Sequence, residues 1–161
     1  MTSITLTNTD AAILADLAAA LRGARLEGEA VFAEAAIGGG RLDARLAGPS
    51  PKALVHYKGT RERPAPEERR ACAMTAELTV LARLGGGAEA AGVASLLGLL
   101  AAARNAVAAD PPQAACCAYG DDGLAPALRW GSPQLDPPDG PWGRARIEVE
   151  VAYMIDSPTD H

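Results

Sequence analysis

The stretch RARIEVEVAYMID, Arg144 to Asp156, decides the fold class, because apolar and charged residues alternate along it as in an extended chain. One set of alternate positions carries the acidic residues Glu148, Glu150 and Asp156. The other set is apolar and comprises Ile147, Val149, Val151, Tyr153 and Ile155. The pattern predicts a long strand with one buried face, which lies inside its own sheet rather than pairing with the sheet edge of a neighbouring molecule.

Two more strands are predicted upstream of it. ALVHYKG, Ala53 to Gly59, is short and apolar, and ACAMTAELTVLARL, Ala71 to Leu84, alternates over its whole length. The polar segment TRERPAPEERR, residues 60–70, separates them, which predicts an antiparallel hairpin with an extended, exposed tip. A further short strand is predicted in GEAVFAEAAI, residues 28–37, which contains Val31 and Phe32.

Two helices complete the set of elements. The first is capped by Asn8, Thr9 or Asp10 and ends at Gly23. The second covers AEAAGVASLLGLLAAARNAVA, residues 88–108, and stops at the Asp-Pro-Pro of residues 110–112, where proline lacks the donor of the next turn. Their apolar stripes are Ile13, Leu14, Leu17 and Leu21 in the first helix, and Val93, Leu96, Leu97, Leu100 and Val107 in the second.

The remaining segments read as loops. Residues 38–51 are rich in glycine and proline, with room for one or two helical turns in RLDARLA. Residues 127–143 contain enough proline to allow at most a short edge strand. The chain is therefore expected to form a single domain, residues 1–161, of the α+β class: a mainly antiparallel sheet of four or five strands with two main helices packed on one face.

Composition limits the partners. The net charge of −5 argues against binding a phosphate backbone, because that interaction needs a positive surface, so no direct nucleic-acid binding is expected. The longest apolar run, VASLLGLLAAA, is too short to cross a bilayer, and no membrane segment is expected. Three cysteines without framework spacing, and no basic and apolar leader, indicate a reducing cytoplasm.

Residues that could carry catalysis are few. The histidines are His56, on a predicted strand, and His161, the last residue. Cys116 and Cys117 are adjacent, a spacing that does not bring two sulfurs to one metal ion, and Cys72 stands alone. We therefore expect no catalytic residue, no metal site and no cofactor, and we interpret the cysteines as buried or loop thiols.

Loop residues receive structural interpretations. The carboxylate pairs Asp121 with Asp122, and Asp136 with Asp139, lie in turns without a positioned partner. Trp130 and Trp142 flank a proline loop and are expected to pack across its base.

The order of elements resembles that of a known family. The helix that runs into Asp-Pro-Pro, the RW segment, the proline-rich loop and the terminal ARIEVEVAYMID are similar to the tail terminator, or tail completion, proteins of contractile-tailed, Mu-like phages and prophages. ALVHYKGTRERPAPEERR leading into AELTVLARL matches the strand, polar hairpin tip and strand of that family. The resemblance covers most of the chain after residue 25 and rests on pattern rather than on particular side chains.

The resemblance implies a structural role. Such proteins form a homo-oligomeric ring, usually a hexamer, on the head-proximal end of the tail tube. The ring stops polymerisation of tube and sheath and offers a surface to the head-neck connector proteins, in a virion tail assembled in the host cytoplasm. The alternative is another head-tail connector or minor tail protein of a phage or gene transfer particle.

The charged hairpin tip is the expected interaction site with neighbouring subunits or the tube. Opposite charges alternate there, so that adjoining subunits could exchange ion pairs, although a mixed-charge tip is also typical of a merely solvated hairpin. The residues are Arg61, Glu62, Arg63, Glu67, Glu68, Arg69 and Arg70.

Overall fold

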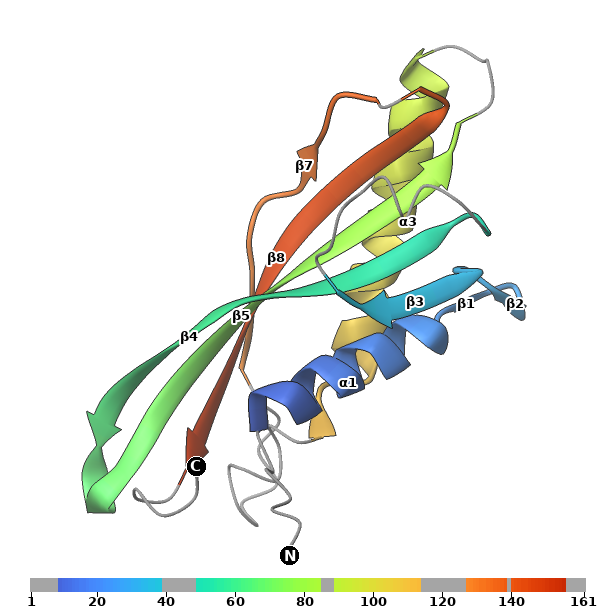
Figure 1. Ribbon diagram of the computed structural model, residues 1–161. Coiled ribbons are helices and arrows are strands. Elements are labelled where there is room, and N and C mark those ends of the chain that lie inside the picture. Colours follow the sequence, from blue (N-terminus) through green and yellow to red (C-terminus); the bar gives the residue numbers. More distant parts are fainter. Residues whose placement is uncertain (1–8, 39–48, 85–88, 114–126, 139, 156–161) are drawn as a thin grey trace, which may run out of the picture.

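The computed structural model describes residues 9–38, 49–84, 89–113, 127–138 and 140–155. Two helices and eight strands lie in these ranges, with a short 3-10 turn between the two longest strands in the middle of the chain (Figure 1). The elements are α1 Thr9–Arg22, β1 Arg25–Leu26, β2 Glu29–Ala30, β3 Glu34–Ile37, β4 Lys52–Ala65, η1 Pro66–Glu68, β5 Arg69–Arg83, α3 Glu89–Ala109, β6 Leu128–Trp130, β7 Gln134–Leu135 and β8 Trp142–Ile155.

Six of the strands form one mixed sheet in the order β3-β4-β5-β8-β6, with β7 also paired to β8. Only β3 and β4 run parallel; the other pairs are antiparallel. The strands β1 and β2 form a separate small hairpin. The α+β class and the largely antiparallel sheet are confirmed, but the sheet has more strands than the four or five predicted, because β6 and β7 are too short to show a period.

The alternation in the last strand determines its burial. Ile147, Val149, Val151 and Tyr153 are at most 4% exposed, whereas Glu148, between the first two, is exposed. In register with them, Leu78 of β5 lies between Val55 and Ile147 on the same face of the sheet. The strand predicted from this stretch is confirmed, and it lies inside its own sheet, between β5 on one side and β6 and β7 on the other.

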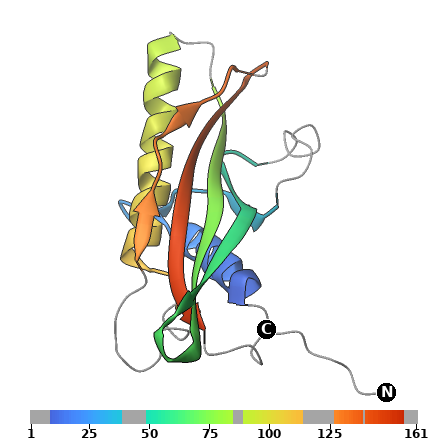
Figure 2. The ribbon, with the colours of Figure 1, turned by 90° about the vertical axis from the view of Figure 1, so that its left-hand side faces the viewer.

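Both helices supply side chains to the same hydrophobic cluster as this face of the sheet. In Figure 2, α3 lies along one side of the three long strands. The buried stripe of α3 is Leu96, Leu100, Ala103 and Val107. Leu97, which the sequence placed in the stripe, is 41% exposed. Because α3 is apolar on nearly all sides, large side chains alone do not mark its buried face.

The hairpin tip is much tighter than predicted. Strands β4 and β5 continue to Ala65 and Arg69, so that residues 60–65 are strand and only Pro66–Glu68 form the turn. Backbone pairing with β5 keeps this polar segment extended. Pro64 is tolerated because β3 pairs with β4 only up to Val55, which leaves the distal part of β4 as an edge strand among the described residues.

Two smaller expectations need correction. A short strand is present in residues 28–37 as predicted, but it is β3; Val31 and Phe32 lie just before it, between β2 and β3, where Phe32 is buried in the core. The two tryptophans do not pack together, because Trp130 is in register with inward-facing Val149, whereas Trp142 is in register with Arg83 on the other face. Trp142 joins Leu54 and Leu81 in a second small hydrophobic cluster.

Some predictions cannot be compared with the structure, because they fall on residues 1–8, 39–48, 85–88, 114–126, 139 and 156–161, which lie outside the described residues.

Candidate assembly interface

The far end of the sheet projects beyond the helices as a three-stranded ribbon, at the lower left of Figure 1. We call it the ribbon end and define it as residues 60–65 of β4, 69–74 of β5 and 151–155 of β8, with the turn 66–68. Pairing is continuous across these strands, with Arg70 opposite both Pro64 and Ile155. The sequence-predicted interaction residues all lie on this element.

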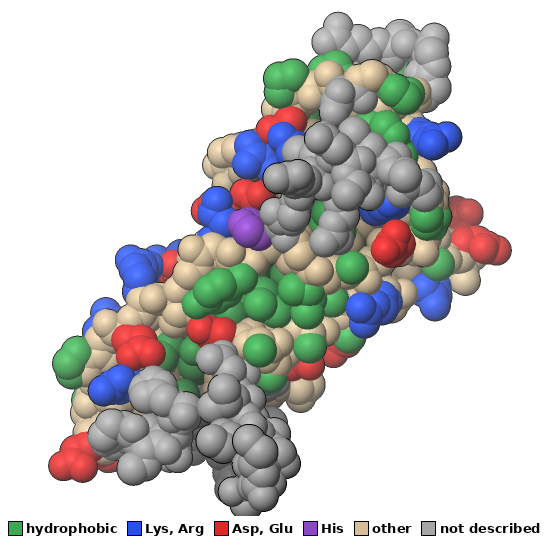
Figure 3. Space-filling view, in the orientation of Figure 1, with side chains coloured by type: hydrophobic (Ala, Val, Ile, Leu, Met, Phe, Trp, Pro, Cys, Tyr) green, Lys and Arg blue, Asp and Glu red, His purple; other side chains and the backbone are tan. Residues whose placement is uncertain are grey.

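Some of those charges are used within the molecule. Arg61 donates a hydrogen bond of 2.9 Å to Glu150 of β8, and Arg70 donates one of 3.0 Å to Glu62 across the hairpin. Both pairs are largely at the surface, so that each contributes little to folding stability. Figure 3 shows acidic and basic side chains interspersed along this side of the molecule.

The carboxylates at the tip, unlike those of Glu62 and Glu150, have no ion-pair partner among the described residues. Glu67 and Glu68 are exposed and form no hydrogen bond or ion pair with any other residue that the structure describes. Their backbones are left-handed, with φ of 63° and 59°. This conformation favours glycine or asparagine and costs other residues roughly 1–2 kcal/mol each. Two glutamates therefore occupy positions that backbone preference alone would give to other residues.

Beside the tip is a hollow of about 620 Å³, which we call the arginine trough. Its floor contains the small side chains of Ala71, Ala73 and Ala152. Arginines stand around it: Arg61 and Arg63 from β4, and Arg129 from β6. Arg61 is paired with Glu150, but Arg63 and Arg129 have no hydrogen-bond or ion-pair partner among the described residues.

Sequence reasoning missed Arg129. The residue lies in a three-residue strand, and its place beside the trough follows from the register that sets it opposite Glu150. No local pattern in ALRWG encodes that register, because it depends on how β6 meets a strand some twenty residues later in the chain. A basic residue in a short edge strand is a weak signal by itself.

A half-buried carboxylate, that of Asp10, anchors α1 to the base of the ribbon end. Asp10, in the first turn of α1, accepts a hydrogen bond of 2.6 Å from the Thr60 hydroxyl and another of 2.6 Å from the Tyr153 hydroxyl. Tyr57 donates a third, of 3.1 Å. Burial, then the hydrogen bond to Asp10 and its negative charge, raise the pKa of Tyr153 far above the ordinary value.

Cys72 lies in the same region, buried, in register with Tyr153. Burial raises the pKa of this thiol above its ordinary value, which keeps it protonated at neutral pH and weakens it as a nucleophile. His56 is half-buried on β4. Within the described ranges, no three His, Cys, Asp or Glu side chains lie close enough together to hold a metal ion.

The outer face of the sheet carries an ion-pair network, which corrects the interpretation of Asp136 as a turn residue without a partner. Asp136 pairs with both Arg144 and Arg146, and Arg146 also reaches Glu77. The hydrogen bond from Arg146 to Asp136 raises the pKa of the guanidinium. The network fastens the proline segment to β8 and β5 and leaves its charges satisfied.

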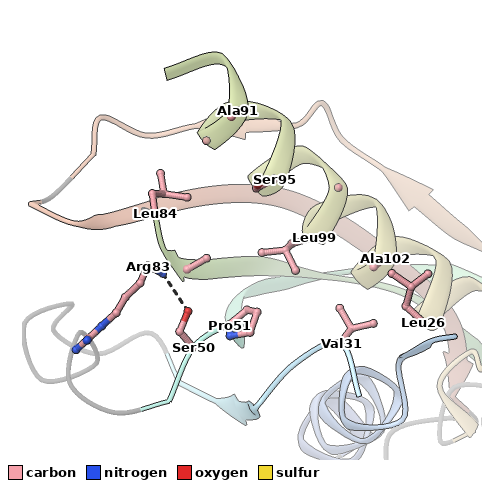
Figure 4. A pocket seen from close by; sticks show the side chains of 13 residues that line it. Leu26, Val31, Ser50, Pro51, Arg83, Leu84, Ala91, Ser95, Leu99 and Ala102 are labelled. Atoms are coloured by element: carbon pink, nitrogen blue, oxygen red, sulfur yellow. Dashed lines mark hydrogen bonds between the residues drawn. The ribbon is translucent and has the colours of Figure 1, made fainter. Parts of the chain in front are cut away.

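A second hollow, of about 800 Å³, lies between α3 and the start of β4 (Figure 4). Apolar side chains such as Leu99, Val31 and Pro51 line it, and at one end the Arg83 amide donates a hydrogen bond of 3.0 Å to Ser50 Oγ.

Helix α3 is long and apolar enough to span a membrane by length and composition, contrary to the expected absence of such a segment. Of the apolar window that passes this test, 22% is buried inside the structure. One such helix is weak evidence for a membrane span, because the core helices of soluble proteins, which are mostly buried, pass the same test.

Comparison with known proteins adds no relative. The chain matches none of the protein families with which it was compared. It also matches none of the curated proteins.

Proposed function

We propose that this protein is a structural assembly protein, a tail terminator that forms a ring on the head-proximal end of a phage or prophage tail tube. The proposal rests on the sequence resemblance described above. One structural observation supports it best: the ribbon end projects beyond the helices and presents charged side chains that have no ion-pair partner among the described residues. A charged projection of this kind suits contact between macromolecules better than chemistry on a small substrate.

A ring subunit needs two different lateral surfaces that meet when the subunit is repeated by rotation. The ribbon end supplies a tip whose two carboxylates have no partner in the described part of the chain and, on neighbouring strands, the arginine trough. In the proposed assembly, six subunits close the ring, which stops growth of the tube and sheath and presents a surface to the head-neck connector. This role needs neither cofactor nor metal, nucleic acid nor membrane.

The experiment that tests this function measures tube length. The tail-tube protein of a contractile-tailed, Mu-like phage is polymerised with and without the purified protein, and the tubes are measured by negative-stain electron microscopy. A terminator shortens the length distribution and appears as a density at one end of each tube. Density on the tube without any effect on its length identifies instead another connector or minor tail protein. Tubes of unchanged length without added density would contradict both roles.

A further inference from the structure

The ribbon end carries two sets of unpaired opposite charges. Glu67 and Glu68 are exposed carboxylates at the turn, and Arg63 and Arg129 are exposed guanidiniums beside the trough. None of the four has a hydrogen-bond or ion-pair partner among the described residues. The numbers and signs of the charges match, two carboxylates for two guanidiniums, so that each set is a suitable partner for the other.

The two sets do not satisfy each other within one subunit. Arg63 is only a few residues from Glu67 along the hairpin, yet no ion pair joins them. The neighbouring carboxylates Glu62 and Glu150 are already engaged by Arg70 and Arg61. The trough therefore carries positive charge that no described carboxylate pairs with, beside the small side chains of Ala71, Ala73 and Ala152.

We propose that the acidic tip of one copy docks in the arginine trough of a second copy, with the Glu67 and Glu68 carboxylates paired to the partner's Arg63 and the partner's Arg129. The inference specifies which two surfaces meet in the proposed ring. It rests on the proposed function, because it requires subunits that associate. Arginine and carboxylate form two parallel hydrogen bonds, which fix orientation as well as strength. The contact joins unlike surfaces, tip to trough, as successive subunits of a ring require.

The left-handed backbone of the turn supports the same assignment. Glycine or asparagine at residues 67 and 68 would be easier for the backbone, so the glutamates occupy these positions against local preference. Local conflicts of this kind are expected where a side chain serves a function beyond the stability of its own fold.

Charge reversal tests the contact. The tip-reversed variant carries E67R and E68R, and the trough-reversed variant carries R63E and R129E. Association is measured by sedimentation velocity for each variant alone, for their equimolar mixture, and for a control variant with E27R and E29R. The control makes the same change in charge as the tip-reversed variant, but on the exposed β1–β2 hairpin, which lies beside β3 and far from the ribbon end (Figure 1).

Each reversed variant alone should lose association by about tenfold or more, because like charges meet at every contact. The mixture should recover it, since a basic tip then faces an acidic trough and an acidic tip faces a basic trough. Recovery also shows that both variants are folded. The control should associate as the unmodified protein does.

Three results would overturn the inference. If the unmodified protein associates and both reversed variants associate equally well, the proposed tip-to-trough contact is wrong, whereas the proposed ring is not contradicted. If the trough-reversed variant still self-associates but no longer binds tail tubes, the trough serves the tube instead. If the unmodified protein does not associate even on tail tubes, both this contact and the proposed ring are wrong.

Discussion

The Tyr153 hydroxyl donates a hydrogen bond of 2.6 Å to Asp10 Oδ1, which joins two residues 143 positions apart in the sequence. Tyr153 lies near the end of β8 and Asp10 at the start of α1, so the bond ties the first described helix to the base of the ribbon end. Thr60 of β4 donates to the other oxygen of the same carboxylate. One side chain thus fixes a helix against strands from both halves of the chain.

Replacing this carboxylate should destabilise the fold. D10A leaves the hydroxyls of Tyr153 and Thr60 without their acceptor, and we expect the free energy of unfolding to fall by about 1–3 kcal/mol in urea titrations. The control is D110N, which removes an exposed carboxylate just after the C-terminal end of α3, where a negative charge is slightly unfavourable. It should be neutral or slightly stabilising. A D10A protein as stable as the parent would show that the hydrogen bonds contribute nothing.

Stability should fall at alkaline pH. The pKa values of Cys72 and Tyr153 are raised in the folded protein above the ordinary values of 9.0 and 10.0. When the pKa of a group is higher in the folded protein than in the unfolded chain, the folded protein holds the proton more tightly. The resulting stabilisation is complete at pH values below the pKa of the unfolded chain and is lost as the pH rises through the pKa of the folded protein. We expect the free energy of unfolding to decline progressively above pH 9.

The Y153F variant checks the cause of that decline. It removes the phenol that would ionise, so the slope of stability against pH above 10 should be shallower than in the parent, even though the variant starts less stable. An identical slope in both proteins would show that Tyr153 does not cause the alkaline loss.

Replacing both glutamates of the turn should increase the free energy of unfolding. The E67N/E68G variant places residues that accept a left-handed backbone at both positions, and we expect it to be more stable by about 1 kcal/mol in thermal or urea unfolding. E67A/E68A removes the same charges without easing the backbone and should not gain stability. On the proposed contact, both variants should associate more weakly than the parent. A loss of stability in E67N/E68G would contradict the geometry of the turn.

Two leucines of α3 provide a matched pair. L100A removes a buried side chain and should cost about 2–5 kcal/mol, whereas L97A changes a side chain that is 41% exposed and should cost far less. Urea unfolding of the two variants side by side measures the difference. Equal losses would mean that the helix is rotated relative to the arrangement described above.

The elements that the sequence predicted well are those whose signal is local. Strict alternation around Val149 and Val151 marks a half-buried strand without knowledge of its neighbours, and the Asp-Pro-Pro stop marks the end of α3. Both are properties of a few consecutive residues. The α+β class follows from the order of such elements.

The features that could not be predicted depend on pairing over long distances. Residues 60–65 are polar and contain Pro64, yet they are strand because β5 and β8 extend alongside them. The trough exists because Arg129 comes to lie opposite Glu150, and the buried face of α3 includes Ala103 rather than Leu97. Registers and helix rotations of this kind are set by the packed core as a whole.

Whether the protein forms the proposed ring is decided by its native mass, measured by light scattering on a size-exclusion column from low to high micromolar concentration and in the presence of tail tubes. We expect a stable species of six subunits, six times 16.5 kDa, in solution or bound at one end of the tube. A protein that stays at 16.5 kDa at every concentration and leaves the tubes bare would contradict the proposed ring.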